Sequence, residues 1–367
     1  MSEAVRQIVL KLHSRCNLSC TYCYVYHSLD QGWMRQPVTM SEDTRLRVAE
    51  RIAEHAERHR LTDLSVVLHG GEPLLAGHDA VAATLTTLRA AVPAGTRLDF
   101  GIQTNGILLD DRYLEIFHEH RVHVGVSLDG GAAANDRHRV YVSGRGSYDR
   151  AAAGLRALAR PEHRDIYGGI LCTIDVRNDP VAVLRDLLAF DPPAIDLLLP
   201  HGNWTTPPPR PAGAMTYAAW LIAVFDHWYD APAGTRIRLF ESMMMRLLGG
   251  ESSTEAIGGE QPGIVVIETD GSYEETDSLK TTADGAAVTG LSVAGHSLDD
   301  VLARVGAPAP PSATCLECPV FAVCAGGLRA HRYRDGSFDH PSAYCDDLYA
   351  VIDHIRNRVT ADLAVLG

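Results

Sequence analysis

Three cysteines near the start of the chain have the spacing of metal ligands. Cys16, Cys20 and Cys23 form a C-x3-C-x2-C motif directly after an apolar run at 8–12 that is typical of a strand. Three thiolates are one fewer than a complete [4Fe–4S] cube requires, so a cluster here would keep one iron open for a small molecule. Zinc usually takes paired cysteines and two further ligands, and no second pair lies nearby. Three buried structural cysteines are the alternative.

A second set of four cysteines lies near the end of the chain. Cys315, Cys318, Cys324 and Cys345 have the spacing C-x2-C-x5-C-x20-C, and four thiolates make a closed metal site. By ligand count alone, this site suits either zinc or a [4Fe–4S] cluster. Cys172 stands alone in an apolar run and is predicted to be a core residue.

Composition and charge limit the function classes. The 367 residues, 46% of them hydrophobic, allow one large domain and a smaller one. A net charge of −13 argues against nonspecific binding to nucleic acid or to an anionic membrane. The sequence has no signal peptide pattern and no apolar run near the ~18 residues of a membrane span. We therefore expect a cytoplasmic, reducing location, in which clustered cysteines serve as metal ligands.

The elements that must position these cysteines alternate between strands and amphipathic helices up to about residue 200. The predicted strands are 8–12, 64–69, 97–103, 122–128, 167–174 and 195–199. The predicted helices are 40–59, 80–91, 111–120, 149–159, 181–190 and 215–229. Six such units in series predict an α/β fold, a partial (β/α)6 TIM barrel with a parallel sheet and right-handed crossovers. In such a barrel the chemistry lies where the strands end.

Unusual residues follow the second and third predicted strands. Gly70, Gly71, Glu72 and Pro73 come after the second, and the glycines would let the backbone approach a ligand closely. A Gly-Gly turn before a helix is nevertheless common. Asn105 follows the third strand in an Asn-Gly pair, which is also an ordinary turn signal.

The fourth predicted strand ends in a polar and charged segment. Ser127 and Asp129 end the strand, and Arg137 and Arg139 follow shortly after. A guanidinium group suits the bidentate binding of a carboxylate. A plain charged loop is the alternative.

The alternating pattern breaks after about residue 200. An Asp-Gly turn between strand-like runs at 264–268 and 273–277 predicts a hairpin. Its acids are mostly expected to be solvated, but Glu268 or Asp277 could serve as a base. We expect three successive segments, a barrel, a bridging region with this hairpin and a cysteine-rich domain with a C-terminal helix: 1–235, 236–310 and 311–367.

The first cysteine motif and the strand-end residues resemble the radical S-adenosylmethionine (SAM) superfamily. The resemblance implies that Cys16, Cys20 and Cys23 hold a [4Fe–4S] cluster whose open iron binds SAM. Asn135 stands where the family has a histidine, and Arg137 rivals Arg139 for the SAM carboxylate. The SAM contacts that it implies are Tyr22, Gly70, Gly71, Glu72, Pro73, Asn105, Ser127, Asp129 and Arg139.

The last cysteines and their surroundings resemble a SPASM domain, the extension of radical SAM enzymes that act on peptides. Full SPASM domains hold two auxiliary clusters with seven cysteines, whereas this segment has four, and Leu328 stands at one cysteine position. The resemblance implies one auxiliary [4Fe–4S] cluster, and two [4Fe–4S] clusters in all.

The stretches 324–333 and 338–345 further resemble FxsB-type maturases, as do 10–16 and 268–271. This implies a ribosomally synthesised precursor peptide as substrate and a bond from an aromatic ring to a β-carbon, which forms a three-residue cyclophane. An electron donor such as flavodoxin or ferredoxin would be needed. Thioether formation, epimerisation and formylglycine formation are alternatives, as is a non-catalytic iron–sulfur or zinc protein.

The family chemistry implies separate roles for the cofactors and for the acids of the chain. A 5′-deoxyadenosyl radical would remove a hydrogen atom from the peptide, the auxiliary cluster could accept an electron, and Asp277 or Glu268 could accept the proton. Because the first predicted strand lies close to residue 1, we expect recognition of a leader peptide at the barrel mouth, near 200–260, or by a separate protein.

Overall fold

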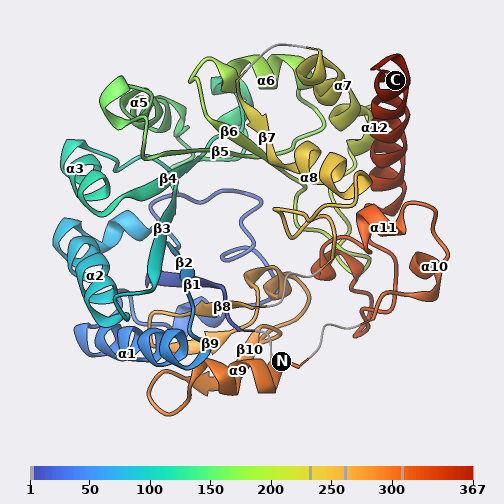
Figure 1. The fold of residues 1–367 in the computed structure, drawn as a ribbon. Helices are drawn as coiled ribbons and strands as arrows, with labels where there is room; N and C mark the ends of the chain where they lie inside the picture. The colour runs from blue at the N-terminus through green and yellow to red at the C-terminus, as the bar shows by residue number, and fades with distance from the viewer. Residues whose placement is uncertain (1–3, 231–233, 260–262, 307–309, 367) are drawn as a thin grey trace. The chain divides into compact units, whose positions relative to one another are not determined.

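The computed structural model describes residues 4–230, 234–259, 263–306 and 310–366. They fall into two compact units that interleave along the chain (Figure 1). The first unit consists of Met1–Ser127, Asp136–Gly168 and Pro262–Pro308. The second consists of Leu128–Asn135, Gly169–Gln261 and Ala309–Gly367.

Four parallel strands form the centre of the first unit. They are β1 (Gln7–His13), β2 (Asp63–Gly70), β3 (Arg97–Thr104) and β4 (Val122–Ser127). Their pairing aligns Ile8 with Val66, and Phe100 with Val122. Ile8, Val66, Phe100 and Val122 are at most 1% exposed, so one face of the sheet is an aliphatic and aromatic core.

The opposite face of these strands carries polar side chains toward its carboxyl end. Lys11 of β1 is in register with His69 of β2 on this face. Farther along the sheet, the side-chain amide of Gln103 donates a hydrogen bond to the Ser127 hydroxyl at 2.8 Å. Because parallel strands end at the same edge, the alternation of side chains brings these groups to one side of the sheet.

Helices cover the apolar face of this sheet in sequence order. They are α1 (Glu42–His59), α2 (His78–Ala91), α3 (Asp111–His120) and α5 (Tyr148–Leu158). Ser41 and Asp110 cap α1 and α3, since their side chains accept hydrogen bonds from the first-turn N–H groups of Thr44 and Tyr113. These caps explain why the helices begin close to the predicted positions.

The sheet of the first unit continues on the other side of β1. There β8 (Ile264–Ile267) pairs with β1 in parallel, and β9 (Ser272–Glu274) and β10 (Val288–Ser292) follow in antiparallel order. Gly271 closes the turn between β8 and β9 at a φ of +86°, a backbone conformation that favours glycine. The predicted hairpin is confirmed, whereas its pairing with β1 has no signal in the sequence.

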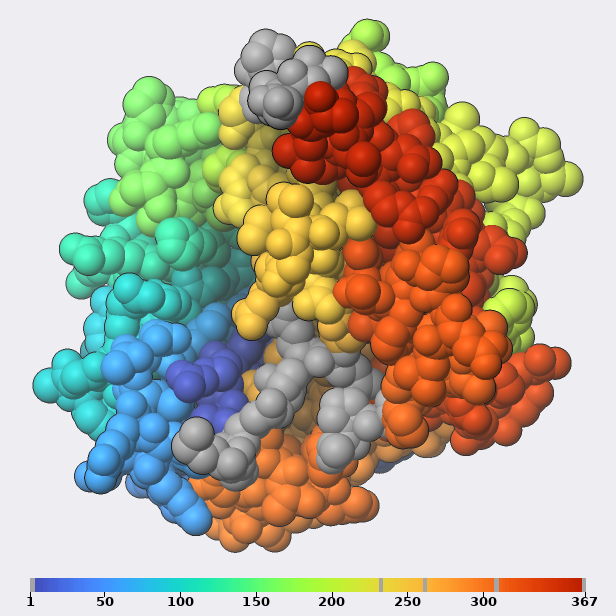
Figure 2. Space-filling view, turned by 45° about the vertical axis from the view of Figure 1, so that its right-hand side comes forward, coloured from blue at the N-terminus to red at the C-terminus, as the bar shows by residue number. Residues whose placement is uncertain are grey.

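The second unit contains its own parallel strands, β5 (Tyr167–Thr173), β6 (Ala194–Leu198) and β7 (Arg236–Ile237). Its longer helices are α6 (Pro180–Leu188), α7 (Tyr217–Tyr229), α8 (Arg238–Leu247) and α12 (Cys345–Leu366). Helix α12 packs against α7 and α8, and Figure 2 shows α8, in yellow, beside the red C-terminal helix at the surface. The described helices include none that is long and apolar enough to cross a membrane.

The predicted α/β fold is confirmed. The six strands predicted before residue 200 correspond to β1 to β6, with ends within two residues of the predicted ones. The sequence analysis missed β10 and α9 (Leu298–Val305). It also missed the two-residue strand β7 and the short helices α4 (Ala132–Asn135), α10 (Ala313–Leu316) and α11 (Phe321–Cys324). Elements of two to four residues are too short to show a period.

Candidate functional site

The first cysteine motif forms a loop after β1. Cys16, Cys20 and Cys23 are partly buried, and none of them forms a disulfide with another described residue. The pKa of Cys16 is raised to about 12, mainly by burial and in part by the charges of neighbouring groups, Cys20 and Cys23 among them. The three thiols therefore lie close enough to influence one another, as the ligands of one metal cluster must.

Backbone amides point at the sulfur atoms of this loop. The N–H of Leu18 donates to Cys16 Sγ at 3.4 Å. The N–H groups of Val25 and Tyr26 donate to Cys23, which lowers the pKa of that thiol, although burial raises it more. Hydrogen bonds to ligand sulfurs are a feature of iron–sulfur sites, so the loop fits a cluster better than it fits three inert core cysteines.

The Gly-Gly pair after β2 holds the base of the cysteine loop. A Cβ atom on Gly70 would lie 2.3 Å from the carbonyl oxygen of His13, and one on Gly71 would lie 2.5 Å from that of Arg15. The N–H of Gly71 donates to His13 O at 2.9 Å. The glycines thus permit a close approach of the cysteine-loop backbone, whereas the sequence analysis gave this role to a ligand.

Glu72 is buried, and its carboxylate accepts three hydrogen bonds. Its carboxylate accepts hydrogen bonds from the Thr104 hydroxyl at 2.7 Å and from the backbone N–H groups of Asn105 at 2.8 Å and Leu74 at 3.0 Å. Burial raises the pKa of Glu72, and these hydrogen bonds oppose the rise. In the described structure Glu72 joins the end of β2 to the end of β3.

Asn105 links the end of β3 to the cysteine loop. Its side-chain N–H donates to the Asn17 side-chain oxygen at 2.7 Å and points toward Cys16 Sγ at 3.8 Å. Its side-chain oxygen accepts the backbone N–H of Ile107 at 3.0 Å. The structure therefore brings predicted residues Asn105 and Cys16 together.

Arg139 is also held against the cysteine loop. The N–H groups of Ser19 and Thr21 donate to the carbonyl oxygens of Val140 at 2.8 Å and His138 at 3.1 Å. The Arg139 guanidinium donates to the Tyr22 hydroxyl at 3.0 Å. The Arg139 charge lowers the pKa of Cys23, although burial has the larger, opposite effect.

The two rival arginines differ in burial. Arg139 is 7% exposed, whereas the Arg137 side chain lies at the surface. In the second unit, Asp129 accepts the backbone N–H of Thr173 at 3.0 Å, and the Asn135 side chain accepts the N–H of Asp129 at 3.4 Å. Asp129 and Asn135 thus support the loop after β4 and the end of β5.

A buried cluster of charges lies in the first unit, on elements that are far apart in the sequence. Lys11 lies 2.6 Å from Glu268 and 2.7 Å from Asp277, measured between the ammonium nitrogen and a carboxylate oxygen. Lys280 lies 2.6 Å from Glu268, 2.7 Å from Glu274 and 3.3 Å from Asp277. All five side chains are at most 10% exposed, and Lys11 and Lys280 are the only lysines of the chain.

The carboxylates of this charge cluster have unequal pKa values. Burial would raise the pKa of Asp277 and of Glu268, but the ammonium groups of Lys11 and Lys280 outweigh it and hold both below the usual range. Burial raises the pKa of Glu274 to about 7, and the charge of Glu268 adds to the rise. The sequence analysis named Glu268 and Asp277 as candidate bases and expected most of the hairpin acids to be solvated, which is wrong for the buried Glu274. It missed Lys11 and Lys280, which no local pattern connects to these acids.

Among the described residues, two groups of side chains have the ligand types and spacing of a metal site. One is Glu268, Glu274 and Asp277, but all three carboxylates already form ion pairs with Lys11 or Lys280. The other is His55 and His59 of α1 with Asp299 of α9 (Leu298–Val305).

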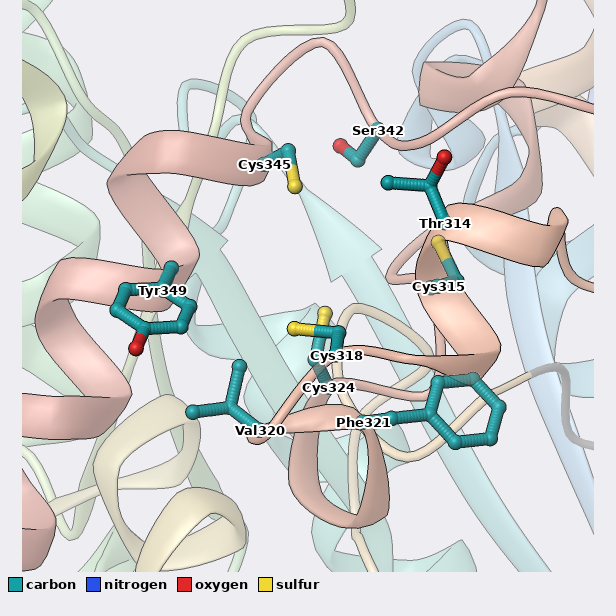
Figure 3. A pocket seen from close by; sticks show the side chains of 10 residues that line it. Thr314, Cys315, Cys318, Val320, Phe321, Cys324, Ser342, Cys345 and Tyr349 are labelled. Atoms are coloured by element: carbon teal, nitrogen blue, oxygen red, sulfur yellow. The ribbon is translucent and has the colours of Figure 1, made fainter.

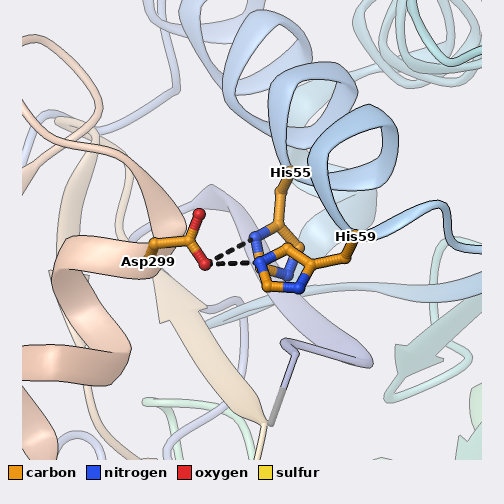
Figure 4. A group of neighbouring side chains, drawn as sticks. All are labelled: His55, His59 and Asp299. Atoms are coloured by element: carbon orange, nitrogen blue, oxygen red, sulfur yellow. Dashed lines mark hydrogen bonds and ion pairs between the residues drawn. The ribbon is translucent and has the colours of Figure 1, made fainter. Parts of the chain in front are cut away.

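Figure 4 shows both imidazoles beside the Asp299 carboxylate, which lies 2.6 Å from His59 Nε2 and 3.5 Å from His55 Nδ1. The backbone N–H of Val5 donates to His55 Nε2 at 2.9 Å, so the neutral ring carries its proton on Nδ1. That is the atom a metal would need, so we interpret the group as a polar contact that fastens α9 to α1.

The four C-terminal cysteines line one cavity in the second unit. Its volume is about 240 Å³ and Phe321, Val320 and Tyr349 complete its apolar wall (Figure 3). Cys315, Cys318 and Cys324 come from the segment of α10 and α11, and Cys345 is the first residue of α12. The pKa of Cys324 is raised to about 12, mainly by burial and in part by the other three thiols, as expected where four thiols converge.

The separation of the sulfur atoms distinguishes two possible metals. Among the described residues, no three cysteine sulfur atoms all lie within 4.8 Å of one another. Four thiolates on one zinc, with bonds of about 2.3 Å, would lie within about 4 Å of one another. The wider spacing in both cysteine sites suits a larger cluster.

Comparisons with known proteins agree with this geometry. Residues 10–185 match the radical SAM superfamily. A serine-type anaerobic sulfatase-maturating enzyme of Klebsiella aerogenes is 34% identical over 39% of this chain, which corresponds to 34% of that enzyme's own length. A cysteine-type anaerobic sulfatase-maturating enzyme of Clostridium novyi is 24% identical over 75% of this chain and 74% of that protein.

Solved structures share the fold. Native anSMEcpe with bound AdoMet superposes with a TM-score of 0.83 and 21% identity, and the match covers 98% of this chain and 100% of the other. The same protein with AdoMet and the Cp18Cys peptide gives a TM-score of 0.79 at 19% identity, covering 99% and 100% of the two chains.

Proposed function

We propose that this chain, whose residues 10–185 match the radical SAM superfamily, is a radical SAM enzyme that oxidises a residue of a peptide substrate. The observation that carries the proposal is that three separate segments of the chain hold one loop in place. The loop of Cys16 to Cys23 is held by the turn after β2, by Asn105 after β3 and by the segment around Arg139. This convergence places three thiols, an amide and a guanidinium in one region.

The cofactors of this proposal are SAM, a [4Fe–4S] cluster at Cys16, Cys20 and Cys23, and an auxiliary [4Fe–4S] cluster at the four C-terminal cysteines. When bound, these groups supply a 5′-deoxyadenosyl radical for hydrogen abstraction and an acceptor for one electron. The wide spacing of the sulfur atoms supports clusters rather than zinc at both sites.

The chain's own residues bind and orient SAM in this proposal. Arg139 is buried beside the loop and presents a planar donor group that suits the SAM carboxylate. The Tyr22 hydroxyl accepts a hydrogen bond from that guanidinium, and Asn105 holds the loop near Cys16. Glu72 acts by fixing the Asn105 backbone, together with the contacts that Gly70 and Gly71 permit.

The charge cluster supplies the proton acceptor. Lys11 and Lys280 keep Asp277 and Glu268 ionised, so either can take a proton from the oxidised substrate. Asp277 is close enough for its charge to raise the pKa of Cys23, after the larger effect of burial. The proposed base therefore lies within electrostatic reach of the proposed cluster.

Two outcomes of this oxidation are compatible with the same residues. The sulfatase-maturating relatives support oxidation of a serine or cysteine to an aldehyde, formylglycine. The sequence similarity around 324–345 supports the crosslink of an aromatic ring to a β-carbon, a cyclophane. A precursor peptide and a flavodoxin or ferredoxin as electron donor, in the cytoplasm, complete either version.

The first experiment tests SAM chemistry without a peptide. Anaerobically reconstituted protein, given SAM and a chemical reductant, is expected to form 5′-deoxyadenosine, whereas the Cys20→Ser variant is not. A parent protein that binds iron and sulfide but forms no 5′-deoxyadenosine would contradict the proposal. The matched control is Cys172→Ser, because Cys172 is a buried thiol within β5.

The second experiment separates the two outcomes. The protein is co-expressed with the peptide encoded by the small open reading frame beside its gene, and the Cp18Cys peptide serves as an independent probe. A formylglycine product reacts with a hydrazide, whereas a cyclophane does not. A cyclophane formed from a peptide with ring-deuterated aromatic residues loses one ring deuterium. An unmodified mass with both peptides would contradict peptide oxidation.

A further inference from the structure

The charge cluster contains one carboxylate more than it contains ammonium groups. Glu268, Glu274 and Asp277 face Lys11 and Lys280, and the five side chains are shielded from water. With all five groups ionised, the net charge would be −1 in a site of low polarity. One bound proton makes the charge cluster neutral, which burial favours.

The contacts identify the carboxylate that carries this proton. Glu268 and Asp277 each form ion pairs with both ammonium groups. Among the ion pairs of the described residues, Glu274 has one with Lys280 and none with Lys11. Glu274 is therefore the least stabilised of the three anions. From neighbouring elements, His69 of β2 faces the charge cluster, and so do Cys23 and Tyr26. Burial lowers the pKa of His69 and raises the pKa of Cys23 and of Tyr26.

We propose that Glu274 is the residue that finally holds the proton removed from the substrate, and that Lys280 connects it to Asp277. This inference rests on the proposed function. The substrate proton first bonds to a carboxylate oxygen of Asp277. Lys280 Nζ lies 2.7 Å from Glu274 Oε2 and 3.3 Å from Asp277 Oδ1, and Oε2 has no hydrogen-bond partner among the described residues. A small shift of the Lys280 ammonium group lets it give one proton to Glu274 Oε2 and take the proton from Asp277 Oδ1. The electron that leaves the substrate goes to an iron–sulfur acceptor and does not pass through these groups.

The charge cluster can therefore take up one proton from the substrate, and its readiness to do so depends on pH. After the transfer Asp277 is again an anion, Lys280 is again an ammonium ion, and Glu274 is a neutral acid. Burial raises the pKa of Glu274 to about 7, so Glu274 is ready to accept a proton above this pH and already occupied below it. Glu274 does not contact the substrate in this proposal. It receives the proton through Lys280.

The test compares Glu274→Gln with Glu274→Asp and with Glu275→Gln. Glutamine keeps the size but cannot ionise, and aspartate keeps the acid. Glu275 is the adjacent, partly exposed residue and is the matched control, since its backbone N–H bonds to Ala287 outside the charge cluster. Circular dichroism establishes that each variant folds, and iron content establishes that each carries its clusters.

The first readout needs no substrate. Infrared difference titration of the reconstituted protein is expected to show a carboxyl group that ionises within about one unit of pH 7. This signal should persist in Glu275→Gln, shift in Glu274→Asp and vanish in Glu274→Gln. Its absence from the parent, or its persistence in Glu274→Gln, would overturn the inference even if no peptide substrate were modified.

The second readout is the ratio of modified peptide to 5′-deoxyadenosine as a function of pH. For the parent and Glu275→Gln, this ratio should fall about tenfold per pH unit below the pKa of the acceptor. For Glu274→Gln it should be low and independent of pH, while 5′-deoxyadenosine still forms. A parent-like pH profile in Glu274→Gln would overturn the relay and leave peptide oxidation intact.

Discussion

The carboxylate of Glu72 accepts the backbone N–H of Asn105 at 2.8 Å, and this contact joins the ends of β2 and β3 beneath the cysteine loop. The same carboxylate accepts the Thr104 hydroxyl and the Leu74 N–H. Glu72 belongs to a motif for which cofactor contact is predicted. In the structure its carboxylate also positions the neighbouring residues. Its effect on SAM would pass through Asn105 and Cys16.

The first prediction concerns Glu72→Gln. The glutamine N–H₂ would face a backbone or hydroxyl donor, so one buried donor loses its acceptor. We expect a loss of about 2 kcal/mol in the free energy of unfolding, because an unpaired buried polar group costs that much. Urea unfolding measures it, with Glu115→Gln on the exposed side of α3 as the control. An equal stability of the two variants would contradict this role for Glu72.

The second prediction distinguishes Arg139 from Arg137. Arg139→Lys keeps the charge but loses the planar pair of donors, and it should weaken SAM binding about tenfold or more. Arg137→Lys changes a surface side chain and should leave the affinity within about twofold. Equilibrium binding of SAM to the reconstituted proteins decides between them. If Arg137→Lys had the larger effect, the assignment of Arg139 would be wrong.

The third prediction concerns iron content. Reconstituted parent protein should contain about eight iron atoms, two clusters of four. Cys345→Ser should retain about four and still form 5′-deoxyadenosine from SAM, because the loop of Cys16 to Cys23 is separate in sequence from the altered site. Cys172→Ser should retain the parent value. Zinc in place of iron at the C-terminal site of the parent would contradict the interpretation of the wide sulfur spacing.

The fourth prediction concerns how the stability of the fold depends on pH. Glu274 should contribute in the opposite direction from Asp277 and Glu268, although all three belong to one charge cluster. The pKa of Glu274 is raised from its ordinary 4.5 to about 7, so between these values the folded state binds more protons than the unfolded state. Its contribution to stability is present below about pH 4.5 and is lost as pH rises toward about 7, by at most about 1.4 kcal/mol per pH unit. Asp277 and Glu268 have lowered pKa values, so their contribution is lost as pH falls below about 4.

Chemical unfolding of the parent and Glu274→Gln across this range measures the effect. The difference between the parent and the variant should change steadily from about pH 5 to about pH 7, with the parent losing stability relative to the variant. A constant difference would mean that Glu274 does not carry a proton in the folded state.

A fifth prediction uses Lys11. Lys11→Met leaves Glu268 and Asp277 with one ammonium group between them, and removal of one partner from a buried ion pair typically costs about 3–5 kcal/mol. Arg51→Met on α1 is the control, because its guanidinium is only part-buried. If thermal unfolding showed equal losses for both variants, the buried charge cluster would not stabilise the fold.

Spacing along the chain was sufficient for part of this site. The two cysteine sets, the alternation of strands and helices and the turn residues at 70–73 and 105 are local patterns, and the fold that they predict is confirmed. Local patterns suffice because helix and strand periods, and the ligands of one cluster, are set by neighbouring residues. The short strand β7 has no such pattern, since two residues cannot alternate.

The sequence by itself determined the cysteine sets and the order of strands and helices, because these depend on residues close together in the chain. Only the tertiary structure decided the rest. It paired β8 with β1 and so brought Lys11 to Glu268, 257 positions away. It buried Arg139 and left Arg137 exposed. The energies of ion pairs and of burial depend on distances in space, and the packing of a parallel sheet sets those distances independently of separation along the chain.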